Sequence, residues 1–249
     1  LWGHHYCHGR DFSVDDQHKT PICSGSRMKN TTLIDTHIHE RTFSSDSSLA
    51  LEDIVSRAIE MGLDGVCITD HESNGLMEIA TAYSSKTGFL IIVGAEILTY
   101  EGDLTVFGVD HLPEKKLHAQ DMIDLALNVG GVAISAHPFR QNNRGMGNSI
   151  RNVKGLSGLE AFNGSTTPHN NLYAYGLSAE LSLPAFGASD AHEIRAVGRY
   201  ATVFPDRIRD TADFIEAVKN GGTCPAVYTE IGYETIHIHD RLHKGEMLQ

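Results

Sequence analysis

Short segments, most of them continuous apolar runs, alternate along this chain with stretches in which apolar residues recur at helical spacing. The helical spacing covers 51–63, 122–127 and 214–218. Apolar runs of strand length are typical of strands buried on both faces of a sheet. They lie at Thr32 to Asp35, Gly65 to Thr69, Leu90 to Ala95, Leu104 to Val109, Val132 to Ser135, Leu159 to Phe162, Ala185 to Ala188 and Ala201 to Phe204. The pattern predicts an α/β fold, favouring a barrel with one irregular hairpin section over an open doubly wound sheet.

Metal-binding side chains stand where these apolar segments end. Their positions are Asp35-Thr36-His37-Ile38-His39, Asp70-His71, Glu96, His137 and Asp190-Ala191-His192. In an α/β barrel the carboxyl ends of the strands meet at one mouth, where such folds place their active sites. Imidazole nitrogens and carboxylate oxygens bind metal ions, and two histidines at alternate positions of an extended segment point the same way. Five strand ends therefore predict one shared metal site.

Composition narrows the class of partner and the organisation of the chain. The 249 residues carry a formal net charge of -12, which disfavours binding of long nucleic acid on a broad basic face. The four cysteines show no CxxC spacing, and no apolar stretch approaches the roughly 20 residues that span a bilayer. We expect a cytoplasmic protein without a membrane span, of undetermined oligomeric state. We expect a flexible extension over 1–27, a catalytic barrel over 28–230 and a tail over 231–249.

The motifs resemble, in order and in residue type, those of the PHP family, the polymerase and histidinol phosphatase domains. The resemblance covers about 28–219 and rests on Asp35-x-His37-x-His39, Asp46, Thr69-Asp70-His71, Glu96, Ala136-His137-Pro138 and Ser189-Asp190-Ala191-His192. It implies a distorted seven-stranded β/α barrel with two or three divalent ions, Mn2+, Fe2+ or Zn2+. The ligands that it implies are His37, His39, Asp46, His71, Glu96, His137, Asp190 and His192, with Glu96 as the bridge between two ions.

One position departs from the family pattern. Many relatives have a further histidine ligand on the strand after the bridging glutamate, where this chain has Thr105. This difference favours two ions over three. His111 is close in sequence but falls beyond the strand, so we expect it to be a loop histidine.

The expected activity is hydrolysis of a phosphate ester by a metal-bound hydroxide, since two divalent ions can activate water and hold a phosphoryl group. The substrate would be a small phosphorylated metabolite or nucleotide, cleaved as a phosphomonoester. We expect Asp70, Arg140 and His192 to be catalytic, and Asp35 or Asp70 to orient a histidine ligand or to cap a turn. Candidate phosphate-binding side chains are Arg140, Arg144, Arg195 and Arg199, with Arg140 preferred because it follows His137 by three residues.

Two other classes of function remain open at this point. An amidohydrolase could use the same pair of ions, although that class commonly bridges them with a lysine and no predicted strand here ends in lysine. A phosphodiesterase or exonuclease could act on short oligonucleotides. A non-catalytic module would have lost metal ligands, and apart from Thr105 they are present.

Overall fold

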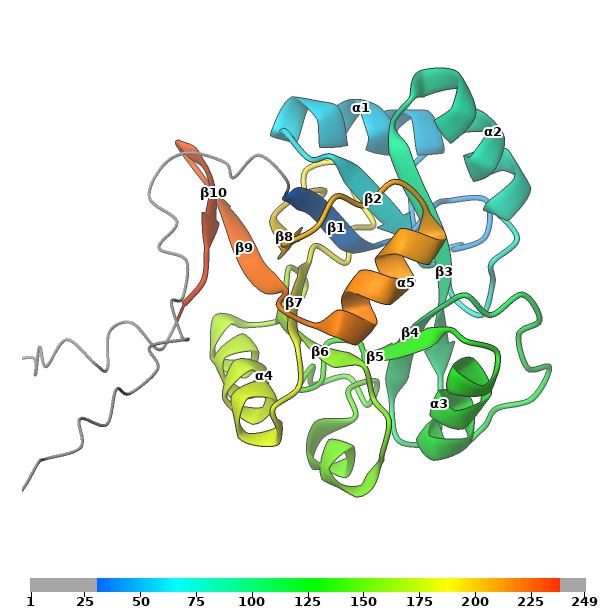
Figure 1. The fold of residues 1–249 in the computed structure, drawn as a ribbon, viewed down its shortest axis with the longest axis vertical. Coiled ribbons are helices and arrows are strands. Elements are labelled where there is room, and N and C mark those ends of the chain that lie inside the picture. Colours follow the sequence, from blue (N-terminus) through cyan, green and yellow to red (C-terminus); the bar gives the residue numbers. More distant parts are fainter. Residues whose placement is uncertain (1–30, 238–249) are drawn as a thin grey trace, which may run out of the picture.

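The computed structural model describes residues 31–237, which form one curled sheet of ten strands with helices packed against it (Figure 1). The strands are β1 Thr32–Ile38, β2 Gly65–Ile68, β3 Leu90–Leu98, β4 Asp103–Phe107, β5 Val132–Ser135, β6 Gly158–Asn163, β7 Ala185–Ala188, β8 Tyr200–Phe204, β9 Cys224–Thr229 and β10 Gly232–Thr235. The α-helices are α1 Leu51–Met61, α2 Met77–Thr87, α3 Ala119–Asn128, α4 Pro168–Leu181 and α5 Thr211–Asn220, and a 3₁₀-helix covers Gly147–Asn152.

The order of strands across the sheet is β10-β9-β8-β1-β2-β3-β4-β5-β6-β7. Strands β1 to β3 are parallel, β4 runs antiparallel to both of its neighbours, and β5 to β7 are parallel again. The sheet curls until the segment after β7 meets the end of β1, where Asp190 N donates to His37 O at 2.8 Å and His39 N donates to Ala191 O at 3.1 Å. The ends of β1 and β7, far apart in the sequence, are therefore side by side.

Large apolar side chains fill the inside of the curl. Phe107, Phe186 and Phe204 are fully buried there, together with smaller apolar residues of β1, β2, β3 and β5. Helix α5 closes this core through Phe214, whose ring centroid lies 4.8 Å from that of Phe107 and 5.4 Å from that of Phe204. The side chain of Asp210 caps the start of α5 by accepting from Asp213 N at 2.9 Å.

Two further apolar clusters lie between the sheet and the outer helices. One joins α1 to β1 and β2 through residues such as Ile54 and Ala58, and the other joins α3 to β4 and β5 through Met122 and Ile123. Because both faces of the central strands are covered, these strands are continuous apolar runs in the sequence.

The predicted α/β class is confirmed, and the curled sheet is consistent with the predicted distorted barrel. The count of seven strands is not confirmed, because the sheet has ten. The eight predicted strands all form, with shifted ends at six of them. The helical spacing revealed neither α2 nor α4. Helix α2 buries only Ala80 and so has little apolar periodicity. Strand β10 lies within the segment that we expected to be a tail, and the predicted extension over 1–27 lies outside the described residues.

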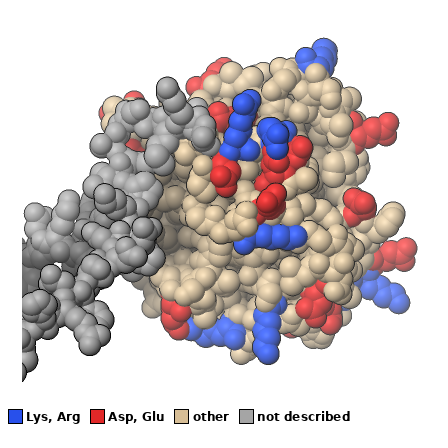
Figure 2. Space-filling view, in the orientation of Figure 1, with Lys and Arg blue, Asp and Glu red and all other residues tan. Residues whose placement is uncertain are grey.

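None of the helices within 31–237 is both long enough and apolar enough to cross a bilayer. On the face shown in Figure 2, lysine and arginine side chains lie among aspartate and glutamate side chains. Neither sign of charge covers that face.

Candidate metal centre

Side chains from the ends of five strands converge at one end of the curled sheet. His37 lies on β1, His39 directly follows β1, and His71 follows β2. Glu96 lies near the end of β3, His137 follows β5, and Asp190 and His192 follow β7. All except His71 and His192 are buried. The structure thus brings together all eight side chains expected as metal ligands, with Asp46 at the outer edge.

Glu96 is the central carboxylate of the cluster. Its Oε1 lies 2.7 Å from His137 Nε2, and its Oε2 lies 2.7 Å from His71 Nδ1. Burial alone would raise the pKa of Glu96, but the neighbouring histidines, His37 above all, hold the pKa well below its usual value. The two oxygens of this carboxylate face different groups of potential ligands, which is the geometry that a bridging ligand requires.

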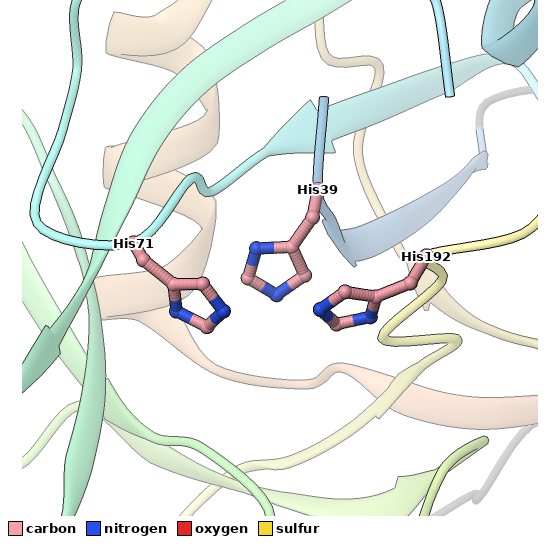
Figure 3. Close-up of side chains that lie close together, drawn as sticks. All are labelled: His39, His71 and His192. Atoms are coloured by element: carbon pink, nitrogen blue, oxygen red, sulfur yellow. The ribbon is translucent and has the colours of Figure 1, made fainter. Parts of the chain in front are cut away.

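Three histidines form the outer group of the cluster (Figure 3). The ring of His39 lies between those of His71 and His192, with centroid distances of 4.3 and 4.2 Å. Asp46 adds a carboxylate 3.2 Å from His71 Nε2 and 3.3 Å from His192 Nε2. A second group comprises His37, His39 and Glu96, and a third comprises Glu96, Asp103 and His137. The groups share members, so ions bound to them would be neighbours.

The hydrogen bonds of the Nδ1 atoms of His37 and His39 show that the Nε2 atoms of these two rings are available to bind a cation. His37 Nδ1 lies 2.7 Å from Glu160 Oε1, and a carboxylate can only accept, so Nδ1 carries the proton. Ser44 Oγ donates to Asp70 Oδ1 at 2.7 Å and therefore accepts from His39 Nδ1 at 3.2 Å. The two Nε2 atoms then face each other at 2.9 Å. Two lone pairs at this distance repel unless a proton or a cation lies between them.

The charges around these rings agree with that geometry. Burial lowers the pKa of His39 to about 4, which leaves this imidazole neutral and able to bind a metal. Burial also acts to lower the pKa of His37, but the negative charges of Glu160, Asp190 and Glu96 outweigh it and raise the pKa to about 10. A proton on His37 therefore supplies positive charge that divalent ions would otherwise bring. The buried donor set of imidazoles and carboxylates fits zinc, iron or manganese.

Asp103 is a ligand candidate that the sequence interpretation missed. It is fully buried, its Oδ2 lies 3.6 Å from His137 Nε2, and its Oδ1 accepts no hydrogen bond from a described residue. Burial and the charge of Glu96 raise the pKa of Asp103 to about 7. Because β4 runs antiparallel to β3, its first residue, Asp103, lies at the end of the sheet that holds the metal ligands. Thr105 lies two residues further along β4, where it pairs with Glu96. The reversed strand direction, visible as a hairpin in the sequence, was the signal for Asp103.

His111, which we expected to be a loop histidine, is exposed and belongs to none of the three groups of potential metal ligands.

The two aspartates expected to support the ligands have different partners. Asp70 accepts from Ser44 Oγ and, at 2.6 Å, from Glu40 N, so it acts on His39 through Ser44. Burial raises the pKa of Asp70 to about 6. Asp35 accepts from the amides of Ser189 and Gly198, both at 2.9 Å, and so ties β1 to the segment around β7. Asp35 binds backbone and Asp70 orients a side chain.

The four candidate arginines divide into two pairs. Arg140 contacts Asp190 Oδ2 and donates to Asn163 Oδ1 at 2.9 Å, and Arg144 donates to Asp103 Oδ2 at 2.6 Å. Both reach the metal centre while remaining partly exposed, at 17% and 32% of their side-chain surface. Arg195 is 90% exposed beside Glu193, and Arg199 donates to Gly164 O at 3.1 Å. Neither contacts one of the three groups of potential metal ligands.

Comparison with known proteins agrees with this architecture. A family model described as PHP-associated matches residues 168–223, which comprise α4, β7, β8 and α5. An uncharacterized protein of Methanocaldococcus jannaschii is 29% identical over 119 residues, covering 47% of this chain and 68% of the relative.

Two solved structures share the fold. A two-domain protein of Bacteroides vulgatus, containing a predicted PHP-like metal-dependent phosphoesterase, has a TM-score of 0.64 and 21% identity, covering 81% of this chain and 69% of that one. A lesion-specific endonuclease of Pyrococcus furiosus has a TM-score of 0.64 and 18% identity, covering 86% and 66%. The matching family model and the shared fold support the resemblance to the PHP family that the sequence motifs indicate.

Proposed function

We propose that this protein is a metal-dependent phosphoesterase that removes phosphate from a small phosphorylated metabolite or nucleotide. One observation carries the proposal: three groups of potential metal ligands overlap through His39 and Glu96, and two arginines reach carboxylates of the same site. Neighbouring cations and forked guanidinium donors are the two elements that phosphoryl transfer needs. The similarity of the fold to a predicted PHP-like phosphoesterase supports the same class of reaction.

The residues that would hold the ions are the expected eight ligands together with Asp103. Divalent ions bound there would lower the pKa of a water molecule and neutralise charge on the phosphoryl oxygens. The protein contributes the fixed positions of the ligands: Glu96 faces two groups at once, and the Asp70–Ser44 pair sets the ring of His39.

Arg140 and Arg144 would bind the phosphoryl oxygens. Each guanidinium is held now by a carboxylate of the site, Asp190 for Arg140 and Asp103 for Arg144. When cations take over these carboxylates, the same N–H groups can turn to an anionic substrate at the partly exposed mouth. The net charge of -12 favours a small substrate over a long polyanion.

The function is tested by removing metals with a chelator, reloading with Mn2+, Fe2+ or Zn2+, and measuring phosphate release from monoesters and product formation from the other substrates. Substrates should include histidinol phosphate, nucleoside monophosphates and nucleoside bisphosphates, with bis(p-nitrophenyl) phosphate, short oligonucleotides, and an amide and a lactone for comparison. We expect release from at least one monoester that is lost on chelation and restored by metal. Preferential cleavage of diesters or oligonucleotides would show a phosphodiesterase, and cleavage of only the amide or lactone would show an amidohydrolase.

Arg140→Ala is expected to lower kcat/KM for that monoester by roughly 10- to 100-fold, because a charge-assisted hydrogen bond contributes about 1.5 to 3 kcal/mol. Arg195→Ala is the matched control and should change kcat/KM less than about twofold, since Arg195 is exposed and does not reach the metal ligands. Equal losses in the two variants would contradict the assignment of Arg140 to phosphate binding.

A further inference from the structure

Glu160 is a buried carboxylate that none of the three groups of potential metal ligands includes. It lies on β6 and pairs in register with Phe186 of β7, a side chain of the inner core. The register between β6 and β7 shifts directly after this pair, between Glu160 and Phe162. A buried carboxylate in the middle of the segment 159–162 destabilises the folded state unless its oxygens accept hydrogen bonds. The donors that Glu160 contacts therefore indicate its role.

One oxygen of Glu160 sets the ring of His37. Glu160 Oε1 accepts from His37 Nδ1 at 2.7 Å, and both side chains are buried. The hydrogen bond fixes the proton on Nδ1 and turns Nε2 toward the site, 3.8 Å from Glu96 Oε1 and 3.7 Å from Asp190 Oδ1. A carboxylate behind a ligating imidazole fixes both its tautomer and its orientation.

The other oxygen sets the backbone of His137. Glu160 Oε2 accepts from His137 N at 3.0 Å and from Asn163 Nδ2 at 3.0 Å. His137 has a φ of 28°, a left-handed conformation that is unfavourable for a residue with a side chain and that persists only where surrounding bonds hold it. In this conformation His137 Nε2 reaches Glu96 Oε1 at 2.7 Å.

We propose that Glu160 is a positioning residue that prepares His37 and His137 together for metal binding. Its two oxygens are already used by three donors, so it holds the ligands without being one. The group of His39, His71 and His192 has no contact with Glu160 among the described hydrogen bonds and ion pairs, and it should depend on Glu160 much less. This inference rests on the metal-binding part of the proposed function and not on the identity of the substrate.

The test measures metal binding without any substrate. Glu160→Gln keeps the size of the side chain and removes its charge. Its metal-free form should keep the circular dichroism spectrum and Tm of the wild type to within a few degrees. Titration with Mn2+, followed by electron paramagnetic resonance and metal analysis, should show affinity weakened by roughly 10- to 100-fold at the sites that use His37 or His137. One Mn2+ should still bind with little change at the group of His39, His71 and His192.

Glu180→Gln is the matched control, because Glu180 lies on α4, which packs against β6, and is exposed in an ion pair with Arg151. It should bind Mn2+ as the wild type does. Equal Mn2+ affinities at every site of Glu160→Gln and the wild type would overturn the inference while leaving the proposed function intact. A wild-type chain that binds no divalent metal would instead overturn the proposed function.

If Glu160→Gln does not fold, NMR of the wild type tests the inference through the tautomer of His37. In Zn2+-loaded chain with 15N-labelled histidine, the resonance lost in His37→Ala should carry a proton on Nδ1 and have Nε2 bound to metal. A proton on Nε2 and metal on Nδ1 would overturn the inference.

Discussion

Glu96→Gln is expected to lower kcat for phosphate release by at least about a thousandfold, since bound metal ions stabilise the transition state by several kcal/mol. Glu96 is the one side chain whose two oxygens lie within 2.7 Å of histidines in two different groups of ligands, among the described residues. Glutamine keeps the shape but replaces one oxygen with a donor that cannot bind a cation. Metal analysis should show fewer ions per chain, together with the loss of rate.

The control for this variant is Glu193→Gln, which changes an exposed carboxylate near the same mouth. It should retain its metals and its rate to within about twofold. A Glu96→Gln protein that keeps both the wild-type metal content and the wild-type rate would show that Glu96 does not bridge ions. Loss of rate with full metal content would assign Glu96 a role in catalysis other than metal binding.

Phe214→Ala is expected to lower the free energy of unfolding by about 3 to 5 kcal/mol, because it leaves a cavity in a core that is closed on all sides. Phe214 is fully buried, and its ring contacts those of Phe107 and Phe204 where α5 closes the inside of the curled sheet. A loss of this size is a large part of the roughly 5 to 15 kcal/mol that stabilises a typical domain. Urea unfolding of the metal-free protein, followed by circular dichroism, measures the change.

Ile231→Ala is the matched apolar control, since Ile231 is 89% exposed between β9 and β10. Its free energy of unfolding should differ from that of the wild type by less than about 0.5 kcal/mol. A change of similar size in both variants would contradict the placement of α5 as the closure of the inner core.

The sequence was most informative where one strand both supplies the core and presents a ligand. At β1 the run Thr32 to Asp35 leads directly to His37 and His39, and at β7 the run Ala185 to Ala188 leads to Asp190 and His192. Because both features lie on one continuous segment, neither needs knowledge of a distant residue. Helix α2 lacked such a signal, as its exposed position leaves little apolar periodicity.

Local sequence patterns did not reveal the contacts between distant segments. Asp103 directly precedes the predicted strand Leu104 to Val109, and only the antiparallel direction of β4 places it at the mouth beside His137, 34 positions later in the chain. Glu160 lies within the predicted strand Leu159 to Phe162, and its role depends on β6 lying near the end of β1, 123 positions earlier. The choice among the four arginines likewise depended on which loops reach the carboxylates.

The sequence by itself determined the α/β class, the approximate positions of eight of the strands and the types of side chain that follow them, since local apolar patterns and neighbouring ligands are properties of short segments. Only the tertiary structure decided that the sheet has ten strands, that Asp103 joins the cluster, and that Glu160 and Ser44 orient His37 and His39. The physical reason is that strand direction, curl and hydrogen bonds between remote segments arise from packing, and packing brings together residues that no local pattern connects.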